Sequence, residues 1–339
     1  MRHLLITLLA FVTTVPAAEP IAPDLIEHDQ RLEAMAEAVA PLPVLHEGRI
    51  KPFDTVARHY LMLLTEGQQT IPATETTPIG LSASAWMLEA MSDREAAYPR
   101  PALRIRAYEV ADWLGLPRRT PAEVDDRNMA WRHSLEELHA PLNANWSRIQ
   151  DISMKEPEHR GRVEVQLLNL VQAVTEFLDA SSSELRLIPG LPDQRVEWQT
   201  PGQVVQARSD DELQRTVLRS WLDLLSAAAE DEPERVAQAA GSIAAATAPL
   251  LSEKRLTTEV WFNTSNLFAD SMVFYILALV LVLLGLAMAP KFFTISALSL
   301  MGVGLLFHTV GIGIRVYIME RPPVATLYET VIFAGWVGV

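Results

Sequence analysis

Two long apolar stretches near the end of the chain constrain its fold more than any other feature. Residues 272–289 form an 18-residue run without a charge, and residues 292–314 form a second apolar run. A helix needs roughly 20 mainly apolar residues to cross a bilayer. The intervening Ala289-Pro290-Lys291 reads as a tight turn. We therefore expect two antiparallel membrane helices, over 269–289 and 292–314, in contact with the lipid bilayer.

A third apolar run begins at Thr326 and reaches Val339 after only 13 further residues. This is shorter than a membrane span requires, so we expect the chain to stop inside a third membrane helix, over 326–339. A longer protein or a separate chain would complete that helix. Thr326 and Glu329 have the spacing of a capping box, which sets where the helix starts. Residues 315–325 then form a loop on the outer side.

The N-terminus reads as a targeting segment. A short basic start precedes an apolar run over Leu4 to Val12, and small residues follow at Ala17 and Ala18. This pattern is typical of a cleaved signal peptide, here residues 1–18. An uncleaved anchor is the alternative. Either reading places the following residues outside the cytoplasm, which predicts a multi-pass protein of a bacterial inner membrane with its large domain in the periplasm.

Charge is distributed unevenly along the chain. The total is −14, and the residues from Ser271 onward carry a net +1, which leaves −15 on the first 270 residues. An acidic domain argues against nucleic acid as a partner and against docking on anionic lipid. The chain has no cysteine, which excludes disulfides, thiolate metal sites and thiol redox chemistry.

Residues 19–268 are predicted to form a mostly helical domain. Within residues 42–58, Val44-Leu45 and Arg49-Ile50 flank His46-Glu47-Gly48, which indicates a small hairpin or tight turn, and Asp54 is expected to cap the helix that follows. The histidine spacings across the chain match no metal-binding motif, so no metal site is assigned. Widely spaced tryptophans such as Trp86 and Trp146 are expected to anchor the core. The predicted helices cover residues 24–40, 54–64, 82–92, 105–115, 161–180, 211–230 and 233–247.

The fold class that follows is mainly α: a helical periplasmic domain leading into a polytopic helical membrane bundle. Gly302, Gly304, Gly311 and Gly313 lie in the second span. Small residues allow membrane helices to approach closely, although no pair has the GxxxG spacing.

His308 is the candidate site residue inside the membrane. Ionisable groups at this depth are costly and usually serve a pathway, a ligand or a specific partner. Arg315 follows seven residues later on the same helix face, about 10 Å further along the axis. An imidazole and a guanidinium at this separation could hold a haem iron and a haem propionate. The alternative is a histidine bonded to a neighbouring helix, with Arg315 reaching the interface.

The segment HTVGIGIRVYIMERPPVATLYETVIFAGW resembles the early membrane segment of CcsA-type (ResC-like) cytochrome c biogenesis proteins of System II. The family pattern is matched here by Arg315, Tyr317, Ile318, Arg321, Pro322, Pro323, Leu327, Tyr328, Glu329, Thr330 and Trp336. Ala325-Thr326 replaces the Thr-Asn that the family more usually has. LPVLHEGRIKPFDTVAR and EVWFNTSNLF are similar to the periplasmic domain of larger members.

The resemblance implies haem export or handling, with delivery of haem to apocytochrome c at the outer face. It also implies a CcsB/ResB-type membrane partner. The family's Trp-rich haem-handling segment has no counterpart in this sequence, so no catalytic residue is assigned and the chain is expected to be the N-terminal part of the synthase. Two alternatives stay open: a membrane-tethered interaction module that recruits apocytochrome without binding haem, and a fragment of a transporter.

Overall fold

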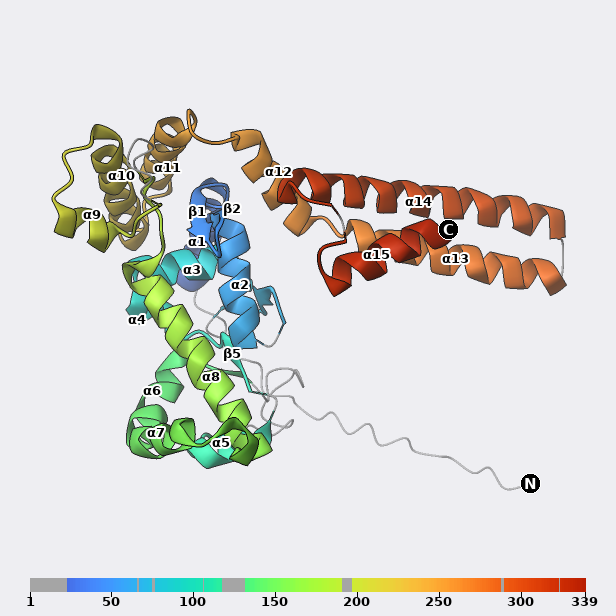
Figure 1. Ribbon diagram of the computed structural model, residues 1–339. Helices are drawn as coiled ribbons and strands as arrows, with labels where there is room; N and C mark the ends of the chain where they lie inside the picture. Colours follow the sequence, from blue (N-terminus) through green and yellow to red (C-terminus); the bar gives the residue numbers. More distant parts are fainter. Residues whose placement is uncertain are drawn as a thin grey trace, which may run out of the picture.

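The structure is a computed structural model that describes residues 23–65, 67–74, 77–105, 107–117, 132–190, 197–287, 290–322 and 324–339. The expected signal peptide, Trp131 and Pro323 lie outside these residues. The fold is mainly helical, as predicted (Figure 1). Short antiparallel strand pairs supply the remaining regular structure.

The first half of the chain forms these elements: α1 (Pro23–Val39), β1 (Pro43–His46), β2 (Arg49–Pro52), α2 (Phe53–Thr65), β3 (Thr70–Ile71), β4 (Leu81–Ser82), α3 (Ala83–Ser92), α4 (Arg94–Ala97), β5 (Leu103–Arg104), α5 (Tyr108–Leu114), β6 (Arg132–His133), α6 (Leu135–Ala144) and α7 (Trp146–Met154). The second half forms η2 (Pro157–His159), α8 (Arg162–Asp179), the π-helical turn η3 (Ala180–Glu184), α9 (Pro201–Ala207), α10 (Glu212–Ala229), α11 (Pro233–Thr247), α12 (Glu253–Thr264), α13 (Leu267–Ala287), α14 (Pro290–Met319) and α15 (Leu327–Gly338).

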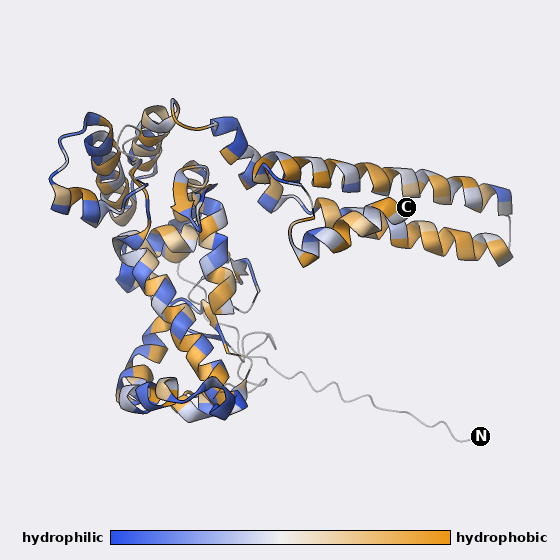
Figure 2. Cartoon of the chain, viewed as in Figure 1, coloured by the Kyte–Doolittle hydropathy of each residue, from blue (hydrophilic) through white to orange (hydrophobic). Residues whose placement is uncertain are grey.

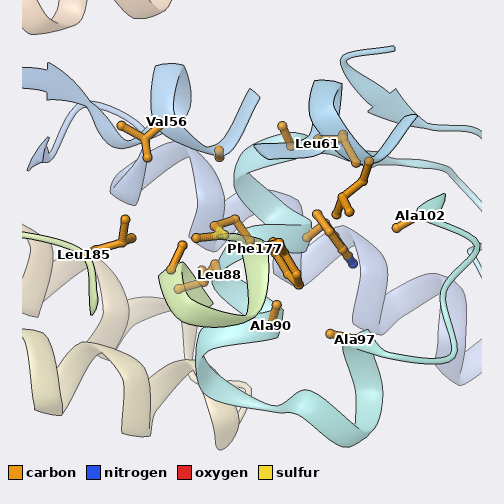
Figure 3. Packing of buried hydrophobic residues seen from close by; sticks show 14 of the residues in the cluster. Val56, Leu61, Leu88, Ala90, Ala97, Ala102, Phe177 and Leu185 are labelled. Carbon is orange, nitrogen blue, oxygen red and sulfur yellow. The ribbon is translucent and has the colours of Figure 1, made fainter. Parts of the chain in front are cut away.

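We call α1 to α11 the helical domain. Its core is a large apolar cluster in which Trp86 of α3 stacks on Phe177 of α8, with ring centroids 4.4 Å apart (Figure 3). Phe177 belongs to the predicted apolar stripe of α8, of which Leu167 and Val174 are also buried. Trp146, by contrast, is 48 % exposed. The prediction that it anchors the core was wrong, because α7 directs it to the surface beside α6.

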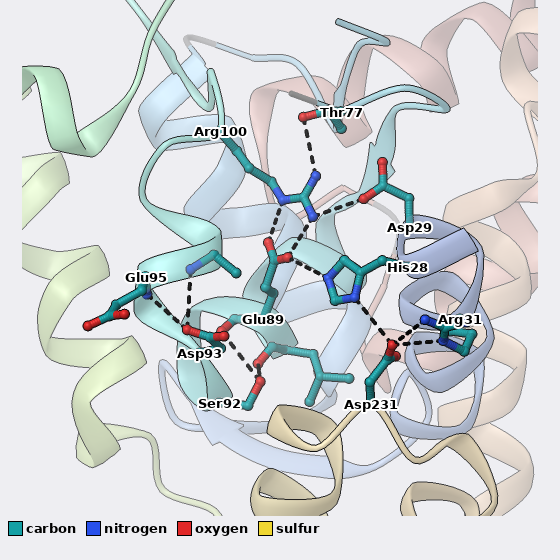
Figure 4. A network of polar contacts seen from close by, with 12 residues as sticks. His28, Asp29, Arg31, Thr77, Glu89, Ser92, Asp93, Glu95, Arg100 and Asp231 are labelled. Atoms are coloured by element: carbon teal, nitrogen blue, oxygen red, sulfur yellow. Dashed lines mark hydrogen bonds and ion pairs between the residues drawn. The ribbon is translucent and has the colours of Figure 1, made fainter. Parts of the chain in front are cut away.

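A buried polar network joins α1 and α3 to the turn between α10 and α11 (Figure 4). Glu89 accepts two short hydrogen bonds from Arg100, at 2.5 and 2.6 Å. Arg100 also forms an ion pair with Asp29, at 2.9 Å. His28 lies between Glu89 and Asp231, at 3.3 and 3.5 Å. Burial of these charges is tolerated because each faces an opposite charge.

The predicted hairpin at residues 43–52 is confirmed. β1 and β2 pair antiparallel with His46 opposite Arg49, and the turn residues Glu47 and Gly48 both have positive φ. Two residues of positive φ are characteristic of a tight two-residue hairpin turn. α2 begins immediately afterwards at Phe53. Asp54 therefore lies within the first turn of α2, and the prediction that it caps this helix was wrong.

Asp54 has a different function in the fold. Its buried carboxylate accepts hydrogen bonds from Arg58, Ser84 and Asn263, at 2.8, 3.0 and 2.9 Å. It thus fixes α2 against α3 and against α12. Two isolated bridges, from Arg186 to Leu45 and from Ile188 to Gln199, are formed by the segment that follows η3.

α13 and α14 form an antiparallel hairpin that projects away from the helical domain (Figure 1). Both helices are long and apolar enough to cross a bilayer, over Leu267–Leu286 and Lys291–Met319. Apolar residues predominate along this hairpin and α15 (Figure 2). α14 continues five residues beyond the predicted end at 314, so Arg315 lies on the helix and the loop that follows is shorter than expected.

Two of the four glycines in α14 account for its close packing on α13. A Cβ atom on Gly304 would lie 2.9 Å from the Tyr275 ring, and one on Gly311 would lie 2.9 Å from the Phe268 ring. Gly302 and Gly313 have no such neighbour among the described residues. Gly304 and Gly311 are seven residues apart, which places them on one face, and their small size allows the two aromatic rings to approach the α14 backbone.

Candidate functional site at the junction of the helical domain and the membrane helices

His308 is buried between the three apolar helices, with 7 % of its surface exposed. Its Nε2 lies 3.1 Å from the carbonyl oxygen of Ile332 in α15, and its Nδ1 lies 3.3 Å from the Tyr275 hydroxyl in α13. A carbonyl oxygen can only accept, so Nε2 carries the ring proton and Nδ1 accepts from Tyr275. His308 therefore connects all three helices, which is the packing alternative raised from the sequence.

Haem ligation requires an imidazole nitrogen with an available lone pair. In this conformation the lone pair on Nδ1 of His308 faces the Tyr275 hydroxyl. His308 therefore offers a metal a nitrogen only after the Tyr275 hydroxyl has moved away.

Arg315, near the end of α14, meets Glu329 in the first turn of α15. Arg315 Nε donates to Glu329 Oε1 at 3.0 Å, and Arg321 lies 3.4 Å from the same oxygen. The other oxygen accepts from the backbone N–H groups of Ala325 and Thr326, at 3.2 and 3.1 Å. The Glu329 carboxylate is thus buried with four donors around it.

The predicted capping box is confirmed, since Thr326 accepts a hydrogen bond from the Glu329 backbone N–H at 3.2 Å. Glu329 therefore has two structural functions: it caps α15 and it holds both arginines.

We call Arg315, Arg321 and Glu329 the arginine–glutamate cluster. Its formal charge is +1. Within the described residues, the hydrogen bonds of Arg315 involve only Nε, and its guanidinium lies 5.5 Å from the centre of the Tyr328 ring. Pro322 is exposed in the adjoining loop.

α12 connects the helical domain to this region. Glu259 of α12 is 4 % exposed and accepts two hydrogen bonds from Arg49 of β2, both at 2.6 Å. Thr55 donates to the same carboxylate at 2.9 Å. Arg255, one turn before Glu259, pairs with Glu320 at the end of α14. Separate ion pairs therefore join α12 to the β1–β2 hairpin and to the loop before α15.

A groove of about 460 Å³ opens where these elements meet. We call it the junction groove. It is bounded by α2, by the end of α12 and the start of α13, and by Tyr328 of α15. Its lining residues are Thr55, Arg58, His59, Met62, Gln69, Phe262, Asn263, Ser265, Asn266, Leu267, Phe268, Ala269 and Tyr328.

Phe268 links the groove to His308. It lines the groove, and its ring packs edge-on against the His308 ring with centroids 5.7 Å apart. Sequence reasoning singled out His308, Arg315 and Tyr328 but not their connection to α2 and α12. The signal for this connection was present in EVWFNTSNLF, where Glu259 and Asn263 are four residues apart on one face of a helix.

Sequence reasoning also assigned no site to His46 and His59. The hairpin folds back on α2 and brings the two imidazole rings to a centroid distance of 4.8 Å, although they lie 13 positions apart in the chain. Lys51 Nζ donates to Nδ1 of His46 at 3.0 Å. Burial, reinforced by Lys51 and His59, lowers the pKa of His46 to about 4. His46 is therefore neutral at physiological pH.

Comparison with known proteins gives a distant match. No family model matches the chain. The chain is 23 % identical to Protein NrfI of Wolinella succinogenes over 329 residues, an alignment that covers 92 % of this chain and 34 % of NrfI. The chain thus spans about a third of the length of this relative. The alignment runs through the helical domain as well as the apolar helices, so the similarity is not confined to membrane-helix composition.

Proposed function

We propose that this chain takes part in cytochrome c biogenesis, as the portion of a System II assembly protein that handles haem at the outer face of the membrane. The similarity to Protein NrfI supports a role in cytochrome c biogenesis in general. The motif of residues 315–336 supports the CcsA-type assignment. Under this proposal the helical domain is periplasmic and α13 to α15 belong to a larger membrane bundle.

The observation that carries the proposal is the arrangement of His308 and Arg315 on α14. The imidazole is buried among three helices, and the guanidinium lies about 10 Å nearer the outer end with N–H groups to spare. Haem brings an iron that accepts an imidazole nitrogen and propionates that pair with arginine. His308 would hold the iron after the Tyr275 hydroxyl leaves Nδ1, and Arg315 would hold a propionate.

The chemistry that this chain supplies is binding and orientation. Phe268 and Tyr275 surround the His308 ring and exclude water from it. Glu329 holds Arg315 in place by accepting a hydrogen bond from the Nε of Arg315. This leaves the outer edge of the guanidinium available to an anion. The cysteine-free sequence suits a protein that meets reduced apocytochrome thiols, because it cannot form mixed disulfides with them.

The test measures the yield of haem-stained c-type cytochrome in cells that depend on the full-length gene. We expect His308→Ala to reduce the yield strongly, whereas Tyr275→Phe, which keeps the ring but removes the hydroxyl from Nδ1, maintains it. Equal yields from wild type and His308→Ala would refute a function for His308 in haem handling. Immunoblots of the membrane fraction control for the amount of protein.

One observation favours a second function, the recruitment of an apocytochrome by the helical domain. α6, α7 and α8 border an apolar groove of about 830 Å³ with Tyr98 and the exposed Trp146 in its wall. An extended peptide with apolar side chains fits such a surface. A photo-crosslinker placed at Leu142 of the full chain should capture apocytochrome c in cells. Crosslinking that Trp146→Ala leaves undiminished would argue against this groove.

A further inference from the structure

Arg321 carries a positive charge that the described residues do not neutralise. Arg315 and Arg321 share one carboxylate oxygen of Glu329, at 3.0 and 3.4 Å, and Arg315 is the nearer of the two. Glu320, the residue before Arg321, pairs with Arg255 of α12 instead. One carboxylate therefore faces two guanidiniums, and the positive charge that is left over lies mainly on Arg321.

The guanidinium of Arg321 also lacks hydrogen-bond partners within the described part of the chain. Its Nη2 makes the 3.4 Å contact with Glu329, its Nε is buried without a partner, and its Nη1 has no hydrogen bond. Unpaired N–H groups shielded from water are unfavourable. The side chain is 39 % exposed, so an acceptor can reach its outer edge. A phosphate suits this edge, because its oxygens can accept two parallel hydrogen bonds from a guanidinium.

The position of Arg321 indicates the source of such a phosphate. Arg321 lies two residues beyond Met319, where the membrane-length segment of α14 ends. The end of a helix that crosses a bilayer meets the phospholipid headgroups. Val324 in the adjoining loop and Leu327 and Tyr328 in the first turn of α15 are exposed, Leu327 by 83 %. An arginine beside exposed apolar side chains suits a phospholipid, which brings a phosphate and acyl chains together.

Charge favours an anionic phospholipid over a zwitterionic one. The arginine–glutamate cluster has a formal charge of +1, and the residues from Ser271 onward also sum to +1. A zwitterionic headgroup brings its own ammonium close to the guanidinium, whereas an anionic headgroup neutralises the cluster. The acidic first 270 residues, whose charge argues against lipid docking by the helical domain, do not include this cluster.

We propose that Arg321 binds the phosphate of an anionic phospholipid at the end of α14, with Leu327 against the acyl chains. Arg315 stays with Glu329 and over the Tyr328 ring in this arrangement, so lipid binding at Arg321 is separate from the haem contact proposed for Arg315. The inference goes beyond the proposed function, since it requires only that α14 crosses a membrane.

The experiment titrates the full chain in detergent micelles with phosphatidylglycerol and, separately, with phosphatidylcholine, and counts bound lipids by native mass spectrometry. The chain should bind one phosphatidylglycerol in preference to phosphatidylcholine. Arg321→Gln should weaken phosphatidylglycerol binding at least about fivefold, which corresponds to about 1 kcal/mol for one basic residue at a membrane surface. Lys254→Gln, which removes an exposed cation of the nearby α12, should leave the affinity unchanged.

Glu329→Gln should change the affinity in the opposite direction. It removes the carboxylate charge that Arg321 now shares, so phosphatidylglycerol should bind more tightly. Loss of folding cannot produce such a gain. The amide oxygen of the new side chain can still accept the hydrogen bond that the Thr326 backbone N–H donates to Glu329.

Weaker binding by Arg321→Gln together with tighter binding by Glu329→Gln supports the lipid site. Affinity that is unchanged in Arg321→Gln, or that does not rise in Glu329→Gln, overturns it. Displacement of phosphatidylglycerol by excess inorganic phosphate also overturns it, because the cluster would then recognise free phosphate rather than a lipid. No haem is present in the titration, so the failure of this inference leaves the proposed function standing.

Discussion

His28 is one residue through which pH acts on the stability of the helical domain. The hydrogen bond with Glu89 is the main cause that raises its pKa above 6.5, Asp231 adds to it, and partial burial acts in the opposite direction. Asp29, Arg100 and Arg31 complete the charges around it (Figure 4). A raised pKa in the folded state means that protonated His28 stabilises the fold. This contribution is complete below pH 6.5 and is lost as pH rises through the folded-state pKa.

We therefore predict that His28→Gln destabilises the domain at pH 6 by about 1 kcal/mol, the usual scale for a partly exposed charged hydrogen bond, and by much less at pH 9. Denaturant unfolding of both proteins at the two pH values measures this difference. His159→Gln, at an exposed histidine, should show no such pH dependence. A destabilisation by His28→Gln that is equal at the two pH values would show that its protonation has no part in stability.

At the scale of elements, α12 is held to the helical domain chiefly by Glu259. Removing one member of a buried ion pair leaves the other without its partner, which typically costs about 3–5 kcal/mol. Arg49 is partly exposed, so we expect about 2–3 kcal/mol for Glu259→Ala, measured by chemical unfolding. Lys254→Ala, on the exposed face of the same helix, should cost less than about 0.5 kcal/mol. Equal effects of the two substitutions would mean that the Arg49 pair does not fix α12.

The stability of the contact between α13 and α14 should depend on which glycine of α14 is replaced. Gly304→Ala and Gly311→Ala each place a methyl group against an aromatic ring of α13, and we expect a loss of about 1–3 kcal/mol for each. Gly302→Ala and Gly313→Ala meet no atom within 4 Å among the described residues and should be tolerated. Thermal unfolding in detergent compares the four proteins. Similar melting temperatures for both pairs would contradict the observed packing.

Several helices were predictable because each depends on local information. α8 and α10 follow from their apolar spacing, α11 from Pro233 at its start, and α15 from its capping box. α4, α6, α7, α9 and α12 were not predicted: α4 and α9 are short, and α12 is mostly polar, with a stability that comes from ion pairs. The position of Trp146 and the function of Asp54 depend on neighbours distant in sequence. No local pattern encodes them.

In the candidate site, too, some residues could be predicted from the sequence, whereas their contacts could not. Depth in the membrane singled out His308, and the motif singled out Arg315 and Glu329. The Tyr275 and Ile332 contacts of His308 come from two other helices, and the meeting of His46 with His59 comes from a hairpin folding over α2. Such contacts arise from tertiary packing, which the spacing of histidines in one sequence does not reveal.

At the scale of the whole molecule, the helical domain, α12 and the apolar hairpin meet around one groove, beside the arginine–glutamate cluster and His308. Ion pairs of Arg49 with Glu259 and of Arg255 with Glu320 fix the helical domain and the end of α14 to α12.

The most direct measurement is the stoichiometry of haem bound by the full chain purified in nanodiscs, together with its dependence on Arg315. Our account predicts saturable binding that Arg315→Ala weakens by about tenfold or more, as expected for loss of one charged contact of about 1.5–3 kcal/mol. Lys291→Ala, at the opposite end of the hairpin, should leave binding unchanged. Absence of saturable binding, or equal affinities for wild type and Arg315→Ala, would contradict the account.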